Sequence, residues 1–254
     1  SAAWTAEAKR RLEEELSHQL YPDGIHFELS TGYQGAVIDN YEFVLDLLHC
    51  YGEPVSPSLL AKFHDLYAIY PKLCRPTWDL PDLNDGKNES VAQRTSSALR
   101  YFPDDARYRY FATGGREGVA PEEKSMLLPY AGFAVFRTGD GKNDLYALFD
   151  GGPFGKAHQH EDKLNFILTA YGVHMLDDPG NFYYDNSQMR KYVLTTCSHN
   201  TGKGDNLPQN RRKNYTWHPE DIGKRSRLRM RIGENTEVAE AVYNEGYGEN
   251  LLPV

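Results

Sequence analysis

Residues 91–112 read VAQRTSSALRYFPDDARYRYFA, and the pattern of the chain changes inside this stretch, near Pro103. Up to Phe102 the sequence predicts a helix, whereas residues 108–112 open a series of short aromatic and β-branched runs. Runs of the same kind, separated by Gly, Asp and Asn turns, predict further strands over residues 132–138, 145–149, 164–170 and 238–243. We therefore predict an α+β chain with a helical domain over 1–103 and an antiparallel β-sandwich over 104–254.

The part before Pro103 has helical periodicity. Apolar residues at every fourth position, from Ala8 to Leu20, predict a helix over residues 6–20. Residues 39–51 predict a second helix, and Ser56-Pro57 begins a third. Pro, Asp, Asn and Gly then dominate residues 75–90, which predicts a loop. Successive helices joined by short links are typical of paired helices in a barrel or bundle.

Composition restricts the classes of partner. A net charge of -8 over 254 residues argues against a general nucleic-acid binder, but an anionic sugar polymer can still bind a locally basic cleft. No apolar run reaches the roughly 20 residues of a membrane helix, so no membrane partner is expected. The first residues lack a signal-peptide profile, as a processed or truncated chain also would. A periplasmic or secreted location is expected if the full-length protein has a signal peptide, and a cytoplasmic location remains open.

The residues that could take part in catalysis or metal binding gather between residues 150 and 201. His158 and His160 are two apart, and on a strand this spacing directs both imidazoles to one face. Asp177-Asp178 and His199 follow, each expected after a strand. Two histidines and an aspartate from separate strands suit a zinc ion, although paired histidines also occur as ordinary polar surface. A cupin-type metal site also uses this pair, but it needs a glutamate a few residues later, whereas Glu161 follows His160 directly.

Several segments together resemble the signature of the heparinase II/III-like polysaccharide lyases. Three of them occur in the family's order, namely residues 155–166 (GKAHQHEDKLNF), 176–180 (LDDPG) and 198–201 (SHNT). Upstream, residues 21–24 (YPDG) followed by 27–33 (FELSTGY) resemble the helical-domain motif that carries the family's catalytic tyrosine. The resemblance implies an (α/α) toroid followed by an antiparallel β-sandwich, in agreement with the division predicted from periodicity.

The resemblance also implies roles for individual residues. Tyr33 matches the tyrosine that donates a proton to the glycosidic oxygen, and His158 matches the histidine at the reacting sugar. Tyr184 corresponds to a second tyrosine that some alginate-type relatives use. The implied ligands of one divalent metal, usually zinc, are His160, Asp178 and His199. Asp177 is a competing ligand, and we favour Asp178 because it directly precedes Pro179-Gly180 as in the family.

The chemistry of a uronic acid lyase is consistent with these roles. The enzyme must remove the proton at C5, protonate the departing O4 and neutralise the sugar carboxylate. A histidine with a pKa near 6.5 is a better base at neutral pH than a tyrosine with a pKa of about 10, so we assign His158 as base and Tyr33 as acid. The family's neutraliser is an asparagine or histidine ahead of the tyrosine motif, and this chain has no matching segment. We therefore expect a fragment that lacks the first half of the toroid.

The expected partner is an acidic, uronic-acid-containing polysaccharide or oligosaccharide. Beside the motifs, Glu28, Gln159 and Lys163 are expected substrate contacts. Gln209 and Arg211 either contact a sugar carboxylate or belong to a solvated loop. The missing neutraliser also supports an alternative function, a degenerate relative that binds glycan without cleaving it. The sequence predicts neither the particular polymer nor the oligomeric state.

Overall fold

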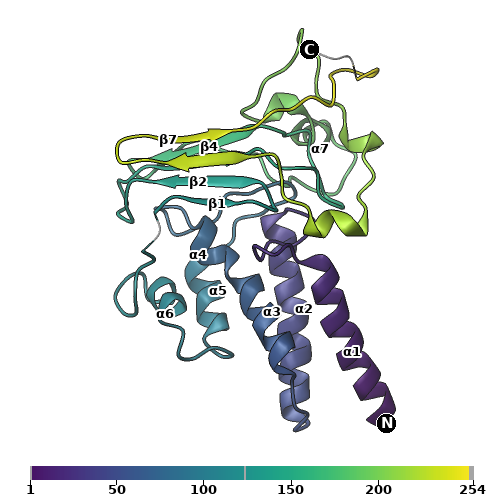
Figure 1. The fold of residues 1–254 in the computed structure, drawn as a ribbon, viewed down its shortest axis with the longest axis vertical. Coiled ribbons are helices and arrows are strands. Elements are labelled where there is room, and N and C mark those ends of the chain that lie inside the picture. The colour runs from purple at the N-terminus through teal and green to yellow at the C-terminus, as the bar shows by residue number, and fades with distance from the viewer. Residues whose placement is uncertain (1, 123, 252–254) are drawn as a thin grey trace.

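The computed structural model describes residues 2–122 and 124–251 of the chain. The α-helices are Ala2–Gln19 (α1), Thr31–Cys50 (α2), Pro57–Tyr67 (α3), Ile69–Leu73 (α4), Val91–Ala98 (α5), Ala106–Ala112 (α6) and Gln188–Val193 (α7). The strands are Met126–Leu128 (β1), Phe133–Arg137 (β2), Tyr146–Asp150 (β3), Asn165–Ala170 (β4), Val173–Leu176 (β5), Arg229–Ile232 (β6) and Glu237–Glu240 (β7). Short 3-10 helices are Thr196–Ser198 (η1), Arg212–Asn214 (η2) and Pro219–Gly223 (η3). Helices α1 to α5 lie at the N-terminal end of the molecule and the sheets at the other end (Figure 1).

Both sheets are antiparallel. Strands β1 to β5 pair in sequence order, and β6 pairs with β7 in a separate two-stranded sheet. The predicted strands over 132–138, 145–149 and 164–170 correspond to β2, β3 and β4. Strand β7 overlaps the start of the strand predicted over 238–243. These segments were recognisable because alternating and β-branched runs between turn residues form strands largely from local sequence.

The expected strand over 108–112 is wrong, because these residues belong to helix α6. The Asp105 carboxylate accepts hydrogen bonds from the backbone N–H groups of Arg107 (2.9 Å) and Tyr108 (3.0 Å), which caps the first turn. Tyr108 and Phe111, three residues apart, are both buried. The chain therefore does not change from helix to strand at Pro103, and β1 begins only at Met126. The domain division after residue 103 stays a prediction.

Helix α2 begins at Thr31, eight residues before the predicted start. Ser30 caps it by accepting a hydrogen bond from the Tyr33 N–H. Gly32 and Gly35 make this first part of the helix resemble a turn in the sequence. Both glycines are needed because another segment packs closely against this part of the helix. A Cβ at Gly32 would lie 3.0 Å from the Asp85 carbonyl oxygen, and one at Gly35 would lie 2.9 Å from the Glu89 carboxylate. The 75–90 loop can therefore lie against the turn that carries Tyr33.

Polar contacts, one of them fully buried, join the helices to the larger sheet. The Asp23 carboxylate, just after α1, accepts hydrogen bonds from the backbone N–H groups of Tyr130 (2.8 Å) and Ala131 (3.0 Å). The hydroxyl of the fully buried Tyr146 on β3 donates to the Leu73 carbonyl, 3.1 Å away. Such contacts fix the two halves relative to one another, so residues from both halves can share one site.

The larger sheet has one exposed edge strand. Strand β5 pairs only with β4, and all four of its residues are exposed.

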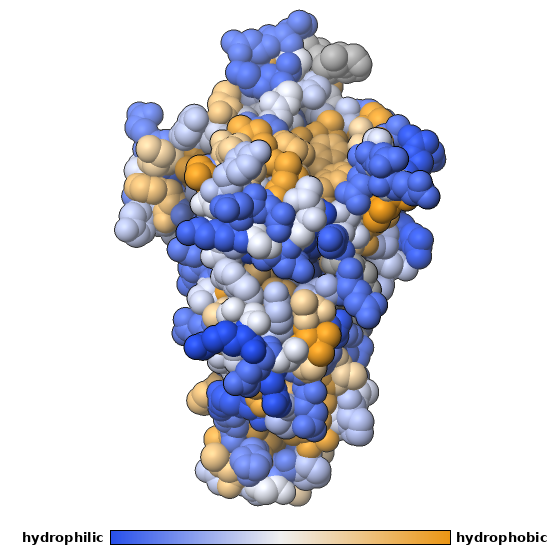
Figure 2. Space-filling view, turned by 90° about the vertical axis from the view of Figure 1, so that its left-hand side faces the viewer, coloured by the Kyte–Doolittle hydropathy of each residue, from blue (hydrophilic) through white to orange (hydrophobic). Residues whose placement is uncertain are grey.

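On the face seen in Figure 2, hydrophobic residues gather in the half of the molecule that holds the sheets, and hydrophilic residues cover most of the rest. Among the described residues, none of the helices has both the length and the apolar character needed to cross a bilayer.

Candidate functional site

The segment with both histidines is a loop, so the prediction that His158 and His160 share one strand face is wrong. His158 has a φ of 57°, in the left-handed region, and residues 157–163 form no strand. The turn at His158 separates the two imidazoles. His158 lies beside Tyr33, and His160 lies fully buried next to His199. The two histidines therefore belong to two adjacent groups of residues. His199 likewise follows η1 rather than the expected strand.

The three predicted catalytic residues lie together. The rings of Tyr33 and His158 are stacked, with centroids 3.6 Å apart and an interplanar angle of 12°. The Tyr184 hydroxyl lies 2.8 Å from the Tyr33 hydroxyl. Tyr33 and His158 are half-buried and Tyr184 is exposed, so solvent reaches the cluster. The geometry gathers two phenols and an imidazole, groups that can donate and accept protons, at one accessible place.

Glu28, predicted to contact substrate, instead contacts His158. Its Oε2 lies 3.0 Å from Nδ1 of His158. A carboxylate only accepts hydrogen bonds, so this contact places the ring proton of a neutral His158 on Nδ1 and leaves the Nε2 lone pair free. Glu28 thereby holds His158 in the tautomer that a general base requires.

Asp85 and Arg190 belong to the same cluster, although the sequence predicted only a loop at Asp85 and no role for Arg190. Arg190 donates two hydrogen bonds to the Asp85 carboxylate, from Nη1 (2.5 Å) and Nη2 (2.9 Å). The Tyr184 hydroxyl donates to the same carboxylate at 2.8 Å. Burial alone would raise the pKa of Asp85, but hydrogen bonds from His160, Arg190 and Tyr184 outweigh it and hold that pKa well below its usual range.

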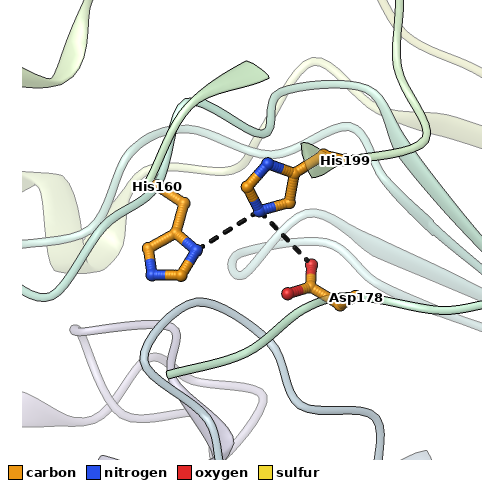
Figure 3. A group of neighbouring side chains, drawn as sticks. All are labelled: His160, Asp178 and His199. Carbon is orange, nitrogen blue, oxygen red and sulfur yellow. Dashed lines mark hydrogen bonds and ion pairs between the residues drawn. The ribbon is translucent and has the colours of Figure 1, made fainter. Parts of the chain in front are cut away.

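A second, buried group consists of the three predicted metal ligands, His160, Asp178 and His199 (Figure 3). Nε2 of His199 lies 3.2 Å from Nδ1 of His160 and 3.8 Å from Oδ2 of Asp178. Imidazole nitrogens about 2.0–2.1 Å from a tetrahedral zinc lie about 3.3–3.4 Å apart. The donor atoms and their spacing therefore fit a divalent metal.

The hydrogen bonds on the outer sides of both rings also favour a cation between them. Nε2 of His160 donates to Oδ1 of Asp85 (2.9 Å), and Nδ1 of His199 donates to the Thr195 carbonyl (2.9 Å). The facing nitrogens of two neutral rings are then both lone pairs, which repel unless one ring gains a second proton or a cation lies between them. Burial lowers the pKa of His199 and so favours the neutral, metal-binding form.

Asp178, rather than Asp177, faces the two histidines. Asp177 accepts a hydrogen bond from the Arg75 guanidinium (2.8 Å) and contacts the His174 imidazole (3.1 Å), so two other side chains already occupy it. Among the described residues, Asp178 accepts hydrogen bonds only from the neutral Asn165 amide and the Gly180 backbone. Burial and the nearby Asp162 raise the pKa of Asp178 well above its usual value, because the carboxylate is removed from water and lies near a second negative charge. A bound metal ion would supply a positive counter-charge.

Three predicted substrate contacts are buried and bonded to protein, which favours a structural role for them, and their contact with a sugar stays a prediction. Gln159 bonds to backbone at Gly155, Ala157 and Glu28, and Gln209 bonds to the backbone of Lys163. Lys163 Nζ lies 3.1 Å from the buried Asp150 carboxylate. Arg211 is half-buried and pairs with Glu245, so the two alternatives from the sequence, a contact with a sugar carboxylate and a solvated loop, both stay predictions. Among the predicted substrate contacts, Glu28 makes a side-chain hydrogen bond to a predicted catalytic residue, His158.

Comparisons with known proteins show which proteins this chain resembles. A family model described as the heparinase II/III N-terminus matches residues 1–110, and a model described as heparinase II/III-like, C-terminal, matches residues 120–254. Two heparin-sulfate lyases are similar in sequence. The one from Pedobacter heparinus is 31% identical over 222 residues, and the one from Bacteroides stercoris is 27% identical over 231 residues. These alignments cover 81% and 87% of this chain but only 33% and 35% of the relatives, so the chain spans about a third of their length.

Solved structures show the same likeness. A heparan sulfate lyase from Pedobacter heparinus matches 92% of this chain and 36% of its own, with a TM-score of 0.74 and 25% identity. A heparinase III matches 81% of this chain and 34% of its own, with a TM-score of 0.74 and 26% identity. The likeness confirms the predicted fold class, a helical toroid portion followed by an antiparallel β-sandwich.

Proposed function

Because the chain belongs to the heparinase II/III family, we propose that it carries part of the active site of a lyase that cleaves uronic-acid-containing polysaccharides by β-elimination. The observation that carries the proposal is the stack of Tyr33 on His158, with Tyr184 in contact with Tyr33. The chain contributes an acid and a base side by side, as this elimination requires. We propose a glycosaminoglycan as the substrate class, since the similar proteins named above are heparin-sulfate and heparan sulfate lyases.

In the proposed reaction, Nε2 of His158 takes the C5 proton of the uronate. The electrons of the C5–H bond form a C4–C5 double bond, and the bond from C4 to the glycosidic O4 breaks. The Tyr33 hydroxyl gives its proton to O4, so a 4,5-unsaturated sugar and a new hydroxyl end result. Glu28 keeps His158 in the basic tautomer before the transfer, and its carboxylate stabilises the imidazolium that the transfer forms. A partner for the sugar carboxylate is also required, and no segment of this chain matches the residue that the resemblance implies for it.

Ultraviolet absorbance of the unsaturated product tests the proposal. This chain, and any longer natural protein that contains it, would be incubated with heparan sulfate, heparin, alginate and other uronates. We expect absorbance to rise with heparan sulfate or heparin. If no uronate gives product while the protein is folded and metal-loaded, the lyase proposal is wrong. Retention on immobilised heparin would then support the glycan-binding alternative.

We further propose that His160, Asp178 and His199 hold zinc, whose role is to fix the buried loops that carry the site. Two imidazoles and one carboxylate are donors typical of zinc. When bound, zinc would supply positive charge to this acidic, buried region. We assign it no part in the proton transfers, which the groups of Tyr33 and His158 can perform themselves.

Exchange of each of the two adjacent aspartates provides a matched test of the metal site. We expect Asp178→Asn to weaken zinc binding by more than about 100-fold, beyond the usual effect of changing an outer partner of a ligand. Asp177→Asn should bind zinc within about threefold of the unchanged chain, because Asp177 pairs with Arg75 and His174 instead. Metal content and competition with a zinc chelator measure both variants. Equal zinc binding by Asp178→Asn and the unchanged chain would contradict the assignment.

A further inference from the structure

Asp85 lies between the tyrosine pair and the predicted metal ligands, and its side chain is only 1% exposed. Its Oδ1 accepts a hydrogen bond from Nε2 of His160 (2.9 Å), and its Oδ2 accepts one from the Tyr184 hydroxyl (2.8 Å). Arg190 bonds to both oxygens and fixes the plane of the carboxylate. One rigid carboxylate therefore contacts a ligand of the proposed metal and a tyrosine of the proposed active site.

The two contacts of Asp85 determine two different properties. Accepting from Nε2 leaves Nδ1 of His160 unprotonated, which is the form that binds a cation. Accepting from Tyr184 uses the single hydrogen of that hydroxyl. In the absence of substrate, Tyr33 must then be the donor at the 2.8 Å contact between the tyrosines, and the Tyr184 oxygen the acceptor. The hydrogen bonds thus run in one direction, from Tyr33 to Tyr184 to Asp85.

We propose that Asp85 is a positioning residue that couples metal binding at His160, Asp178 and His199 to the orientation of Tyr184 and, through it, of Tyr33. A cation on Nδ1 makes the His160 ring a stronger donor to Asp85, and this bond holds the carboxylate where Tyr184 meets it. Coupling of this kind is reciprocal, so the state of the Tyr184 contact also affects metal affinity. The consequence for catalysis rests on the proposed function, whereas the coupling itself rests on these contacts.

Zinc affinity gives the first test, by competition with a chromophoric chelator on the full chain. Asp85→Asn removes the charge and one of the two strong acceptors, and we expect it to weaken zinc binding about 10- to 100-fold. Asp177→Asn serves as the matched carboxylate control and should change affinity by less than about threefold. Unchanged zinc affinity in a folded Asp85→Asn variant would overturn the proposal.

Fluorine NMR gives a second test, and its first part uses the unchanged chain, so that part does not depend on whether Asp85→Asn folds. With 3-fluorotyrosine at Tyr184 alone, we expect its resonance to shift when zinc is added to the otherwise unchanged chain. The same label at the exposed Tyr183 should not shift. No shift at Tyr184, or an undiminished shift in zinc-saturated Asp85→Asn, would contradict coupling through Asp85. Neither test uses turnover, so lack of lyase activity would leave this inference intact, and its failure would leave the lyase proposal intact.

Discussion

Tyr33→Phe is expected to lower kcat/KM for β-elimination by about 10²- to 10⁴-fold, the usual contribution of a positioned general acid. Phenylalanine keeps the ring that stacks on His158 at 3.6 Å but lacks the proton that the departing O4 needs. The loss should fall mainly on kcat, since the shape of the site is kept. Initial rates of ultraviolet absorbance, in whichever protein containing this chain is active, measure the effect.

Tyr183→Phe is the matched control for this prediction. Tyr183 is exposed, its ring packs on Phe182, and it lies next to Tyr184 in the chain. Its loss of a hydroxyl should leave kcat/KM within about twofold. If Tyr33→Phe retained full activity while Tyr184→Phe lost it, the proton-donor role would pass to Tyr184. Full activity in both variants would exclude the tyrosine pair as the acid.

The parts of the fold that sequence predicts well are those that local pattern determines. Strands β2, β3 and β4 lie close to their predicted ranges because alternation and turn residues specify them. Helix α6 was misjudged because aromatic residues favour strands in general, whereas here the Asp105 cap and the spacing of Tyr108 and Phe111 decide. The start of α2 was missed because the need for Gly32 and Gly35 comes from a loop about 50 residues away.

The residues of the candidate site likewise divide into those that a local motif identifies and those that it does not. Tyr33, His158 and the three proposed metal ligands lie in motifs, so resemblance was sufficient to select them. Asp85 and Arg190 lie outside every motif, and their contact joins segments 105 positions apart. A charged residue in a polar loop looks like ordinary surface until its partners are known. For the same reason the sequence predicts Lys163 as a sugar contact, whereas its neighbours in space make it a buried cation.

Lys163→Met is expected to lower the free energy of unfolding by about 3–5 kcal/mol at neutral pH, as removal of one member of a buried ion pair does. Lys163 Nζ lies 3.1 Å from Asp150 and 3.4 Å from Asp162, and all three side chains are at most 4% exposed. Burial alone would lower the pKa of Lys163, but Asp150 and Asp162 outweigh it and raise that pKa. Without the lysine, both carboxylates lose their buried counter-charge. Urea unfolding measures the change.

The pH dependence of the destabilisation and a control variant at the surface distinguish a buried ion pair from a sugar contact at Lys163. Burial raises the pKa of Asp150 to about 6 even with Lys163 present, and loss of the lysine raises it further. The folded variant therefore keeps a proton on Asp150 to a higher pH than the unfolded chain does. Its stability falls as pH rises, so the destabilisation should be smaller at pH 5 than at pH 8. Lys191→Met, on the exposed surface of α7, should change stability by less than about 0.5 kcal/mol. If Lys163→Met instead raised KM and left the free energy of unfolding unchanged, Lys163 would again be a substrate contact. Only a lysine that faces solvent can be lost without leaving two buried aspartates to repel each other.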